Sequence, residues 1–212
     1  MRWESFIGKI PELTHYVPDR KKGSEQGKIL PYRDELLRRF PDIKYRPAAV
    51  LILFYPDLSG NVHTVLIERN WYDGVHSGQI AFPGGKAEPH DKNLQQTALR
   101  ETEEELGVPA KNMEIICPLN RVKIPVSGFE VTPFLAYTEK RPSFVPDPAE
   151  VRNILEVPVD YLLQTPWQVE ERLFEEKFYT VYFLPLKNYK IWGATAMVIA
   201  ELRDIFKHHA DF

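Results

Sequence analysis

An apolar run from Ala48 to Tyr55 (AAVLILFY) limits the possible folds more than any other part of this sequence. A continuous run of this length is typical of a strand that is buried within a sheet. Turn-forming residues follow at 57–61 (DLSGN), and a second strand-like segment returns at 62–69 (VHTVLIER). We therefore expect a sheet that has these two strands near its centre.

Helical and extended patterns alternate irregularly along the rest of the chain. This irregular order predicts an α+β fold, an α/β/α sandwich with a mixed β-sheet between helical layers. Residues 18–31 are polar and interrupted by Gly and Pro, which indicates an exposed loop. Helices are expected before residue 18 and at 33–40, 92–106 and 193–208, and further strands at 79–82, 113–119, 130–138 and 179–186.

The chain length and composition indicate one fairly large domain with a proper core. The chain has 212 residues, of which 43% are hydrophobic, and we divide it into an N-terminal helical extension at 1–44 and a main domain at 45–212. The net charge of -3 gives no general attraction to nucleic acid. The single cysteine, Cys117, excludes an intrachain disulfide and lies in an apolar run, so we expect a buried thiol.

The N-terminal segment and the length of the apolar runs indicate where in the cell the protein is expected. The first residues, MRWESFIGKIPEL, place an acid and a proline where a signal peptide would be apolar. No run approaches the roughly 18 apolar residues that span a bilayer. We expect a cytoplasmic protein, either a monomer or a homodimer, that binds neither membranes nor nucleic acid.

An acidic cluster is predicted on one flank of the helix at 92–106. At about 100° per residue, Glu101, Glu104 and Glu105 share an arc beside the inward stripe of apolar residues. Such neighbouring like charges repel, and partial burial raises their pKa values. Arg100 offsets part of the charge, and a hard divalent ion with oxygen ligands would offset the rest. The alternative is a solvated helix face, which is the common role of a run such as ETEEE.

A pair of glycines precedes this helix in Phe82–Val108 (FPGGKAEPHDKNLQQTALRETEEELGV). Gly84 and Gly85 would let the backbone come close to a ligand, or they form a plain turn before the helix. Together, the loop and the acidic helix fit phosphate oxygens that are held by metal ions.

This segment resembles the Nudix box, GX5EX7REUXEEXGU, where U is aliphatic. Residues 100–108 (RETEEELGV) match its second half except for Thr102 at the first U, and Gly85 matches its first glycine. Asp91 stands at the position of the isolated glutamate, and its spacing to Arg100 is one residue longer than in the common pattern. Asp91 therefore either belongs to the site or caps the helix.

The resemblance implies a pyrophosphohydrolase that uses Mg²⁺ or Mn²⁺ and acts on a small-molecule diphosphate. It implies metal binding and catalysis by the glutamates of the core motif, with Arg100 orienting one of them through a charge-assisted hydrogen bond. Glu150, which follows the predicted strand at 130–138, is either a further ligand or base or an ordinary glutamate at a helix start. The expected site comprises metal ligands and catalytic groups at Glu101, Glu104, Glu105, Arg100 and Glu150, and substrate contacts at Arg69, Gly84, Gly85, Lys86 and His76.

Several segments also resemble the coenzyme A pyrophosphatase branch of this family. These segments are GQIAFPGGK at 78–86, TALRETEEELG at 97–107, PAEV at 148–151 and IWGATA at 191–196. The resemblance implies cleavage of coenzyme A or acyl-CoA to 3′,5′-ADP and 4′-phosphopantetheine. The branch's upstream motif is matched by Arg69, but Asn70 replaces its serine and Gly74 replaces its second arginine.

Other substrates and other roles remain open. ADP-ribose or a dinucleotide is the alternative substrate, and a Nudix-fold binding module without turnover is the alternative class. Trp71 and Tyr72 either stack on an adenine or pack within an exposed loop. For the segment at 192–195 (WGAT) we favour a structural role in which Trp192 packs, Gly193 permits close approach and Thr195 caps the helix or bonds locally.

Overall fold

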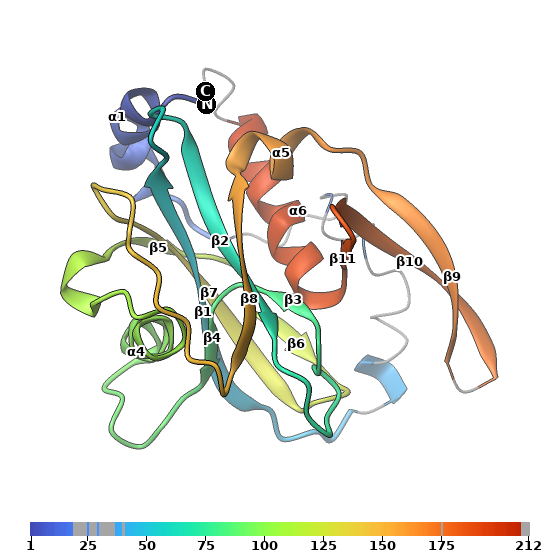
Figure 1. Cartoon of the computed structure of the whole chain (residues 1–212). Coiled ribbons are helices and arrows are strands. Elements are labelled where there is room, and N and C mark those ends of the chain that lie inside the picture. The colour runs from blue at the N-terminus through green and yellow to red at the C-terminus, as the bar shows by residue number, and fades with distance from the viewer. Residues whose placement is uncertain (19–24, 26–28, 30–36, 40, 175, 209–212) are drawn as a thin grey trace.

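The computed structural model describes residues 1–18, 25, 29, 37–39, 41–174 and 176–208. A mixed sheet forms the middle layer, and helices lie on both of its faces (Figure 1). The helices are α1 (Trp3–Leu13), α4 (Leu94–Leu106), α5 (Val159–Gln164) and α6 (Gly193–His208), with a short 3-10 turn at Ala110–Asn112.

The central sheet has eight strands, and its main path runs β3-β2-β1-β7-β5. Strand β4 also pairs with β1, β6 with β7 and β8 with β2. Strands β1 and β7 are parallel, and the other pairs are antiparallel. The bounds are β1 Arg46–Pro56, β2 Val62–Arg69, β3 Ile80–Ala81, β4 Gly84–Lys86, β5 Glu114–Pro118, β6 Val122–Ile124, β7 Phe129–Tyr137 and β8 Val151–Pro158.

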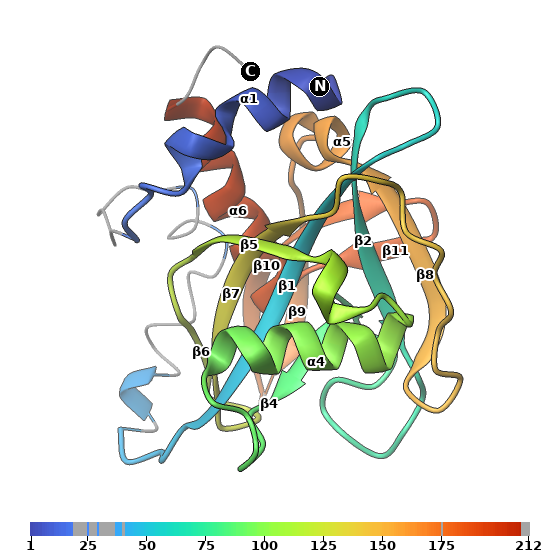
Figure 2. The ribbon, with the colours of Figure 1, turned by 90° about the vertical axis from the view of Figure 1, so that its left-hand side faces the viewer.

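Alternation along β1 explains why both faces of the sheet are covered. Ala49, Leu51 and Leu53 are fully buried in the cluster that includes residues of α4, whereas Ile52 and Phe54 are buried in the cluster that includes residues of α1 and α6. Successive side chains of a strand point to opposite faces. Figure 2 looks onto the face that α4 covers. The prediction of an apolar central strand between helical layers is confirmed.

Strand β1 divides one of its edges between two partners. Its Phe54–Pro56 half pairs with β2, and its Ala48–Val50 half pairs with β4. The other edge pairs with β7 along its length. Strands β2 and β4 therefore part beside the middle of β1, and α4 packs next to this point, in contact with both β1 and β4.

A second, three-stranded sheet follows in the order β11-β10-β9. Its strands β9 and β10 form an antiparallel hairpin that projects from the body of the molecule (Figure 1). The apolar stripe of α6 is buried, and it comprises Ala196, Val198, Ile199, Leu202, Ile205 and Phe206. The bounds are β9 Gln168–Phe174, β10 Lys177–Leu186 and β11 Tyr189–Ile191.

The predicted elements are confirmed at most positions, with three corrections. The helix expected at 92–106 begins at Leu94, because Asn93 caps it by accepting a hydrogen bond from the backbone N–H of Gln96. The glycine segment expected to be a loop is strand β4, since backbone pairing with β1 extends it. Glu150 starts no helix: it precedes β8, a strand that sequence patterns did not indicate.

Parts of the N-terminal predictions fall outside the described residues. The helix expected at 33–40 is described only at residues 37–39, and the loop expected at 18–31 only at Pro18, Glu25 and Ile29. Ile29 is 1% exposed and belongs to the core. The expectation of an entirely exposed loop is therefore wrong at this position. The division into 1–44 and 45–212 stays a prediction.

Candidate functional site

The acidic flank of α4 faces the point where β2 and β4 part. Glu105 is fully buried and Glu101 is 9% exposed, whereas the side chain of Glu104 is 57% exposed. Glu103 points away and accepts a hydrogen bond from the backbone N–H of Ala110. The helix therefore presents Glu101, Glu104 and Glu105 along one flank, two of them largely removed from water.

Glu105 is the most deeply buried of these carboxylates. Its Oε2 accepts a 2.8 Å hydrogen bond from the backbone N–H of Gly84, and its Oε1 lies 3.4 Å from Nη1 of Arg69. Burial raises the pKa of Glu105 to about 8, although the Gly84 hydrogen bond and Arg69 act to lower it. The charges of Glu101 and Glu150 raise this pKa further, so Glu150 acts on the same cluster.

Gly84 and Gly85 lack a Cβ, and this allows β1 and the Glu101 side chain to lie close to their backbone. A Cβ at Gly85 would lie 2.4 Å from Oε2 of Glu101, and a Cβ at Gly84 would lie 2.2 Å from the carbonyl oxygen of Ala49. Gly84 has a φ of 146°, which side-chain-bearing residues rarely adopt. The close approach that these glycines permit is therefore to the protein's own Glu101 carboxylate and backbone. Burial also raises the pKa of Glu101, against the effect of Arg100.

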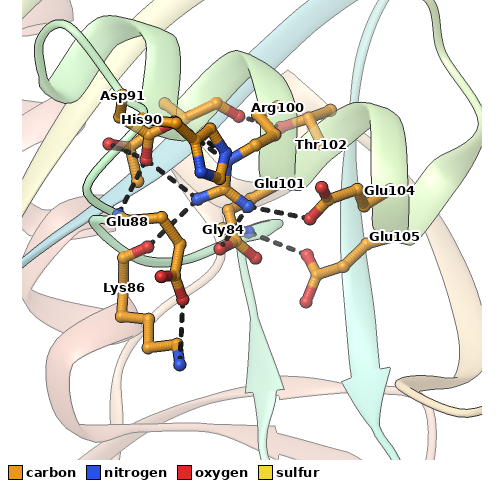
Figure 3. A network of polar contacts seen from close by, with 12 residues as sticks. Gly84, Lys86, Glu88, His90, Asp91, Arg100, Glu101, Thr102, Glu104 and Glu105 are labelled. Carbon is orange, nitrogen blue, oxygen red and sulfur yellow. Dashed lines mark hydrogen bonds and ion pairs between the residues drawn. The ribbon is translucent and has the colours of Figure 1, made fainter.

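Arg100 joins the carboxylates into one network, which Figure 3 shows from close by. Its Nε and Nη2 donate to the two carboxylate oxygens of Asp91 at 2.9 and 3.0 Å. Its Nη1 lies 2.9 Å from Oε1 of Glu101 and 2.8 Å from Oε2 of Glu104. Arg100 thereby fixes the orientation of two glutamates.

Asp91 supports this network and does not cap α4. Its Oδ2 accepts hydrogen bonds from the backbone N–H of Glu88 and from the hydroxyl of Thr97. The hydrogen bonds from Arg100 hold the pKa of Asp91 well below its usual range. The suggestion that Asp91 caps the helix is wrong, because Asn93 takes that position.

The expected substrate-contacting residues lie at different distances from this cluster. Arg69, at the end of β2, reaches Glu105, and its buried Nε has no hydrogen-bond partner within the described structure. Lys86 is largely exposed and pairs with Glu88 at 2.9 Å. His76 lies in the loop between β2 and β3, where its ring hydrogen-bonds Gln79.

Glu150 is tied to the cluster through the backbone. The N–H of Asn70 donates to the carbonyl of Glu150 at 2.8 Å, and the N–H of Asp147 donates to the carbonyl of Glu105. The loop before β8 is thus held against both β2 and α4. Arg152, two residues further on, was not singled out from the sequence, since a lone arginine in a strand carries no recognisable pattern.

The carboxylates of this site are ligands of the type that a hard divalent cation prefers, although they do not converge on a single position. Among the described residues, no group of three or more His, Cys, Asp and Glu side chains is arranged to hold an ion. Glu104 is turned toward Arg100 instead. The available ligands are carboxylate oxygens, and buried Glu105 and Glu101 have raised pKa values that a nearby dication would reverse.

The IWGATA segment has a structural role that differs from the expected one. The hydroxyl of Thr195 donates to the carbonyl of Ile80 in β3 at 2.9 Å, so it joins α6 to the central sheet and does not bond locally. Gly193 has a φ of 65° with nothing within 4 Å of its Cβ position, so it serves a backbone turn and permits no close approach. Trp192 packs under the guanidinium of Arg172.

A comparison with family models matches residues 44–182 to the NUDIX domain. This chain belongs to the Nudix family. The match runs from β1 into β10 and includes α4 with its carboxylates. The family expected from the Nudix box and the expected class of enzyme are confirmed, and Nudix hydrolases generally use divalent metal ions.

Curated relatives of this Nudix chain include bacterial proteins called NudL, described as uncharacterized Nudix hydrolases. The NudL of Pectobacterium atrosepticum is 32% identical over 167 residues, which cover 76% of this chain and 83% of that protein. The NudL of Yersinia pestis is 36% identical over 162 residues, covering 74% and 78%. These names state no substrate, so the coenzyme A branch stays a prediction.

Solved structures support the Nudix fold. RenU, a Nudix hydrolase from M. smegmatis, aligns with a TM-score of 0.54 at 21% identity, covering 77% of this chain and 86% of that chain. This likeness confirms the predicted mixed-sheet Nudix architecture. Among the described residues, no helix of the Nudix chain has both the length and the apolar character needed to cross a bilayer.

Proposed function

We propose that this Nudix hydrolase is a metal-dependent pyrophosphohydrolase, with Glu101, Glu104 and Glu105 as ligands of Mg²⁺ or Mn²⁺. The observation that carries the proposal is the burial of Glu105 and Glu101 on one flank of α4. Burying carboxylates so close together is unfavourable unless a cation compensates them. Within the described structure, Arg69 approaches Glu105 only at 3.4 Å.

The residues of the site would have separate roles in hydrolysis. A bound divalent ion would neutralise charge on the phosphate oxygens and lower the pKa of an attacking water. Arg69, whose side chain is 26% exposed, would donate from its guanidinium to a phosphate oxygen. Water attacks one phosphorus, the phosphoanhydride bond breaks, and each product keeps one of the two phosphates of the diphosphate linkage. Of Glu101, Glu105 and Glu150, the carboxylate that does not bind a metal ion takes the proton from water.

For the substrate, we propose coenzyme A or acyl-CoA, cleaved to 3′,5′-ADP and (acyl-)4′-phosphopantetheine. The resemblance of the segments around residues 78–107 and 191–196 supports this branch. Gly74 departs from it, and a side chain at this position would start 2.3 Å from the ring of Tyr72. The Tyr72 ring thus lies where the second arginine of the motif would begin.

A substrate panel tests both levels of the proposal. The full chain would be incubated with Mg²⁺ or Mn²⁺ and separately with coenzyme A, acetyl-CoA, ADP-ribose, a diadenosine polyphosphate and ATP, in ¹⁸O water. Release of 3′,5′-ADP, identified by mass spectrometry, is the expected result. Faster cleavage of ADP-ribose or of the dinucleotide would overturn the coenzyme A assignment, and failure to cleave any diphosphate would favour a binding module.

A further inference from the structure

An exposed tryptophan and an exposed arginine lie together near the end of β2 that carries Arg69. Trp71 is 66% exposed, and the guanidinium of Arg152 lies 5.6 Å from the centre of its ring. Single exposed rings are common on protein surfaces, so the exposure of Trp71 is informative only together with the guanidinium beside it and the fixed position of the ring. An aromatic face next to a guanidinium group is suited to a nucleotide, because the planar base can stack on the ring and the negatively charged phosphate can pair with the guanidinium.

The Trp71 side chain is held in place despite its exposure. Its backbone N–H donates to Oδ1 of Asn70 at 2.8 Å, and the Asn70 side-chain amide donates to the carbonyls of Pro148 and Ala149. Its ring lies against Gly78, where a Cβ would be 3.2 Å from the nearest ring atom. A positioned ring loses less conformational entropy when a ligand stacks on it.

The guanidinium of Arg152 is exposed and has N–H groups that can donate hydrogen bonds to a ligand. Its carboxylate neighbour is Glu68, at 3.5 Å, and Glu68 already accepts hydrogen bonds from Asn153 and from the hydroxyl of Tyr189. The carboxylate of Glu68 therefore has hydrogen-bond donors other than Arg152. An arginine fork of this kind suits a phosphate group, which it can hold with two hydrogen bonds.

The pair lies next to the groups that are proposed to act on the diphosphate. Trp71 follows Arg69 by two residues, and Arg152 follows Glu150 by two residues. Strands β2 and β8 place these residues together, since Arg69 pairs with Val151 in their register. The subsite requires a ligand whose diphosphate lies at Glu105 and Arg69 and whose nucleotide end reaches this pair.

We propose that Trp71 and Arg152 form the subsite for the nucleotide end of the substrate. The base stacks on Trp71, and a phosphate carried on the ribose pairs with Arg152. This subsite deepens the proposed pyrophosphohydrolase function and rests on it for the position of the diphosphate. Preference for a ribose-phosphorylated nucleotide would then depend on a residue in β8, outside the motif of the catalytic helix.

Binding of product-like nucleotides tests the subsite without turnover. Calorimetric titration would compare adenosine 3′,5′-bisphosphate with adenosine 5′-monophosphate on the wild-type chain, W71A, W71F and R152Q. We expect W71A to weaken both ligands at least about fivefold and W71F to restore part of the loss. R152Q should abolish the preference for the bisphosphate. R141Q, which removes an arginine paired with Glu156 further along β8, should change neither.

Steady-state kinetics provide the second readout. With coenzyme A and dephospho-coenzyme A as substrates, R152Q should raise KM for the first and leave kcat within about twofold. Unchanged binding and unchanged KM in both W71A and R152Q would overturn the subsite. A wild-type chain that binds the bisphosphate through Trp71 but cleaves no diphosphate would overturn the proposed hydrolase function and leave the subsite standing.

Discussion

The backbone N–H of Gly84 donates a 2.8 Å hydrogen bond to Oε2 of Glu105. This bond connects β4 with the last turn of α4, and it points a fully buried carboxylate at the gap between β2 and β4. Because Arg69 approaches the second oxygen of Glu105, the carboxylate is held from two sides. The position of Glu105 therefore depends on strand pairing as much as on the helix that carries it.

Replacing Glu105 should separate catalysis from folding. Glutamine retains an oxygen that can accept the Gly84 N–H, but it removes the charge that a divalent ion needs. We expect E105Q to lower kcat by about 100-fold or more while the circular dichroism spectrum is retained. Turnover close to that of the wild type, measured by product release at saturating Mg²⁺, would show that Glu105 is not required for catalysis.

The same variant should change how stability depends on pH. Burial raises the pKa of Glu105 in the folded state to about 8, from an ordinary value of 4.5. Below the ordinary value both states are protonated, so the group has no effect. As pH rises from the ordinary pKa toward 8, the unfolded state ionises first. The folded state then loses about 1.4 kcal/mol of stability for each pH unit.

Urea unfolding of the metal-free chain between pH 4 and 9 measures this effect. The difference in free energy of unfolding between E105Q and the wild type should grow in favour of E105Q from pH 4.5 to 8 and level off above. Added Mg²⁺ should reduce the difference, because it stabilises the charged carboxylate only in the wild type. A difference that does not vary with pH would contradict the raised pKa.

A methyl group at Gly85 should disturb the site and leave the fold intact. In G85A the new Cβ would lie 2.4 Å from Oε2 of Glu101, which has to move away. We expect kcat to fall about tenfold or more, with little loss of thermal stability. The matched control is G8A on α1, where nothing lies within 4 Å, and it should keep activity and gain about 0.5–1 kcal/mol of stability.

Removing the charge of Asp91 should loosen the orientation of Arg100. D91N loses the charge-assisted pair of hydrogen bonds to Arg100, so Glu101 and Glu104 lose a fixed partner. We expect the Mg²⁺ concentration for half-maximal activity to rise about tenfold or more. E88Q removes an equal charge from a side chain that pairs with Lys86, and it should stay within about twofold of the wild type. Equal metal dependence in the two variants would contradict a positioning role for Asp91.

Sequence patterns predicted the main elements because each depends on contacts near in the chain. The continuous apolar run of β1, the 3.6-residue periodicity of α4 and the left-handed glycine at its end, Gly107, are local properties. Strand β8 escaped prediction, because its alternate exposure leaves a mixed pattern (VRNILEVP) that only pairing with β2 makes extended.

The sequence by itself determined the family, the acidic helix and the types of residue at its flank. The tertiary structure alone decided the rest: Glu105 is buried against Gly84, Asp91 holds Arg100 and does not cap α4, and Arg152 meets Trp71. The physical reason is that burial and ion pairing depend on distances between segments that are far apart in the chain. Strand register sets those distances, and no local pattern records them.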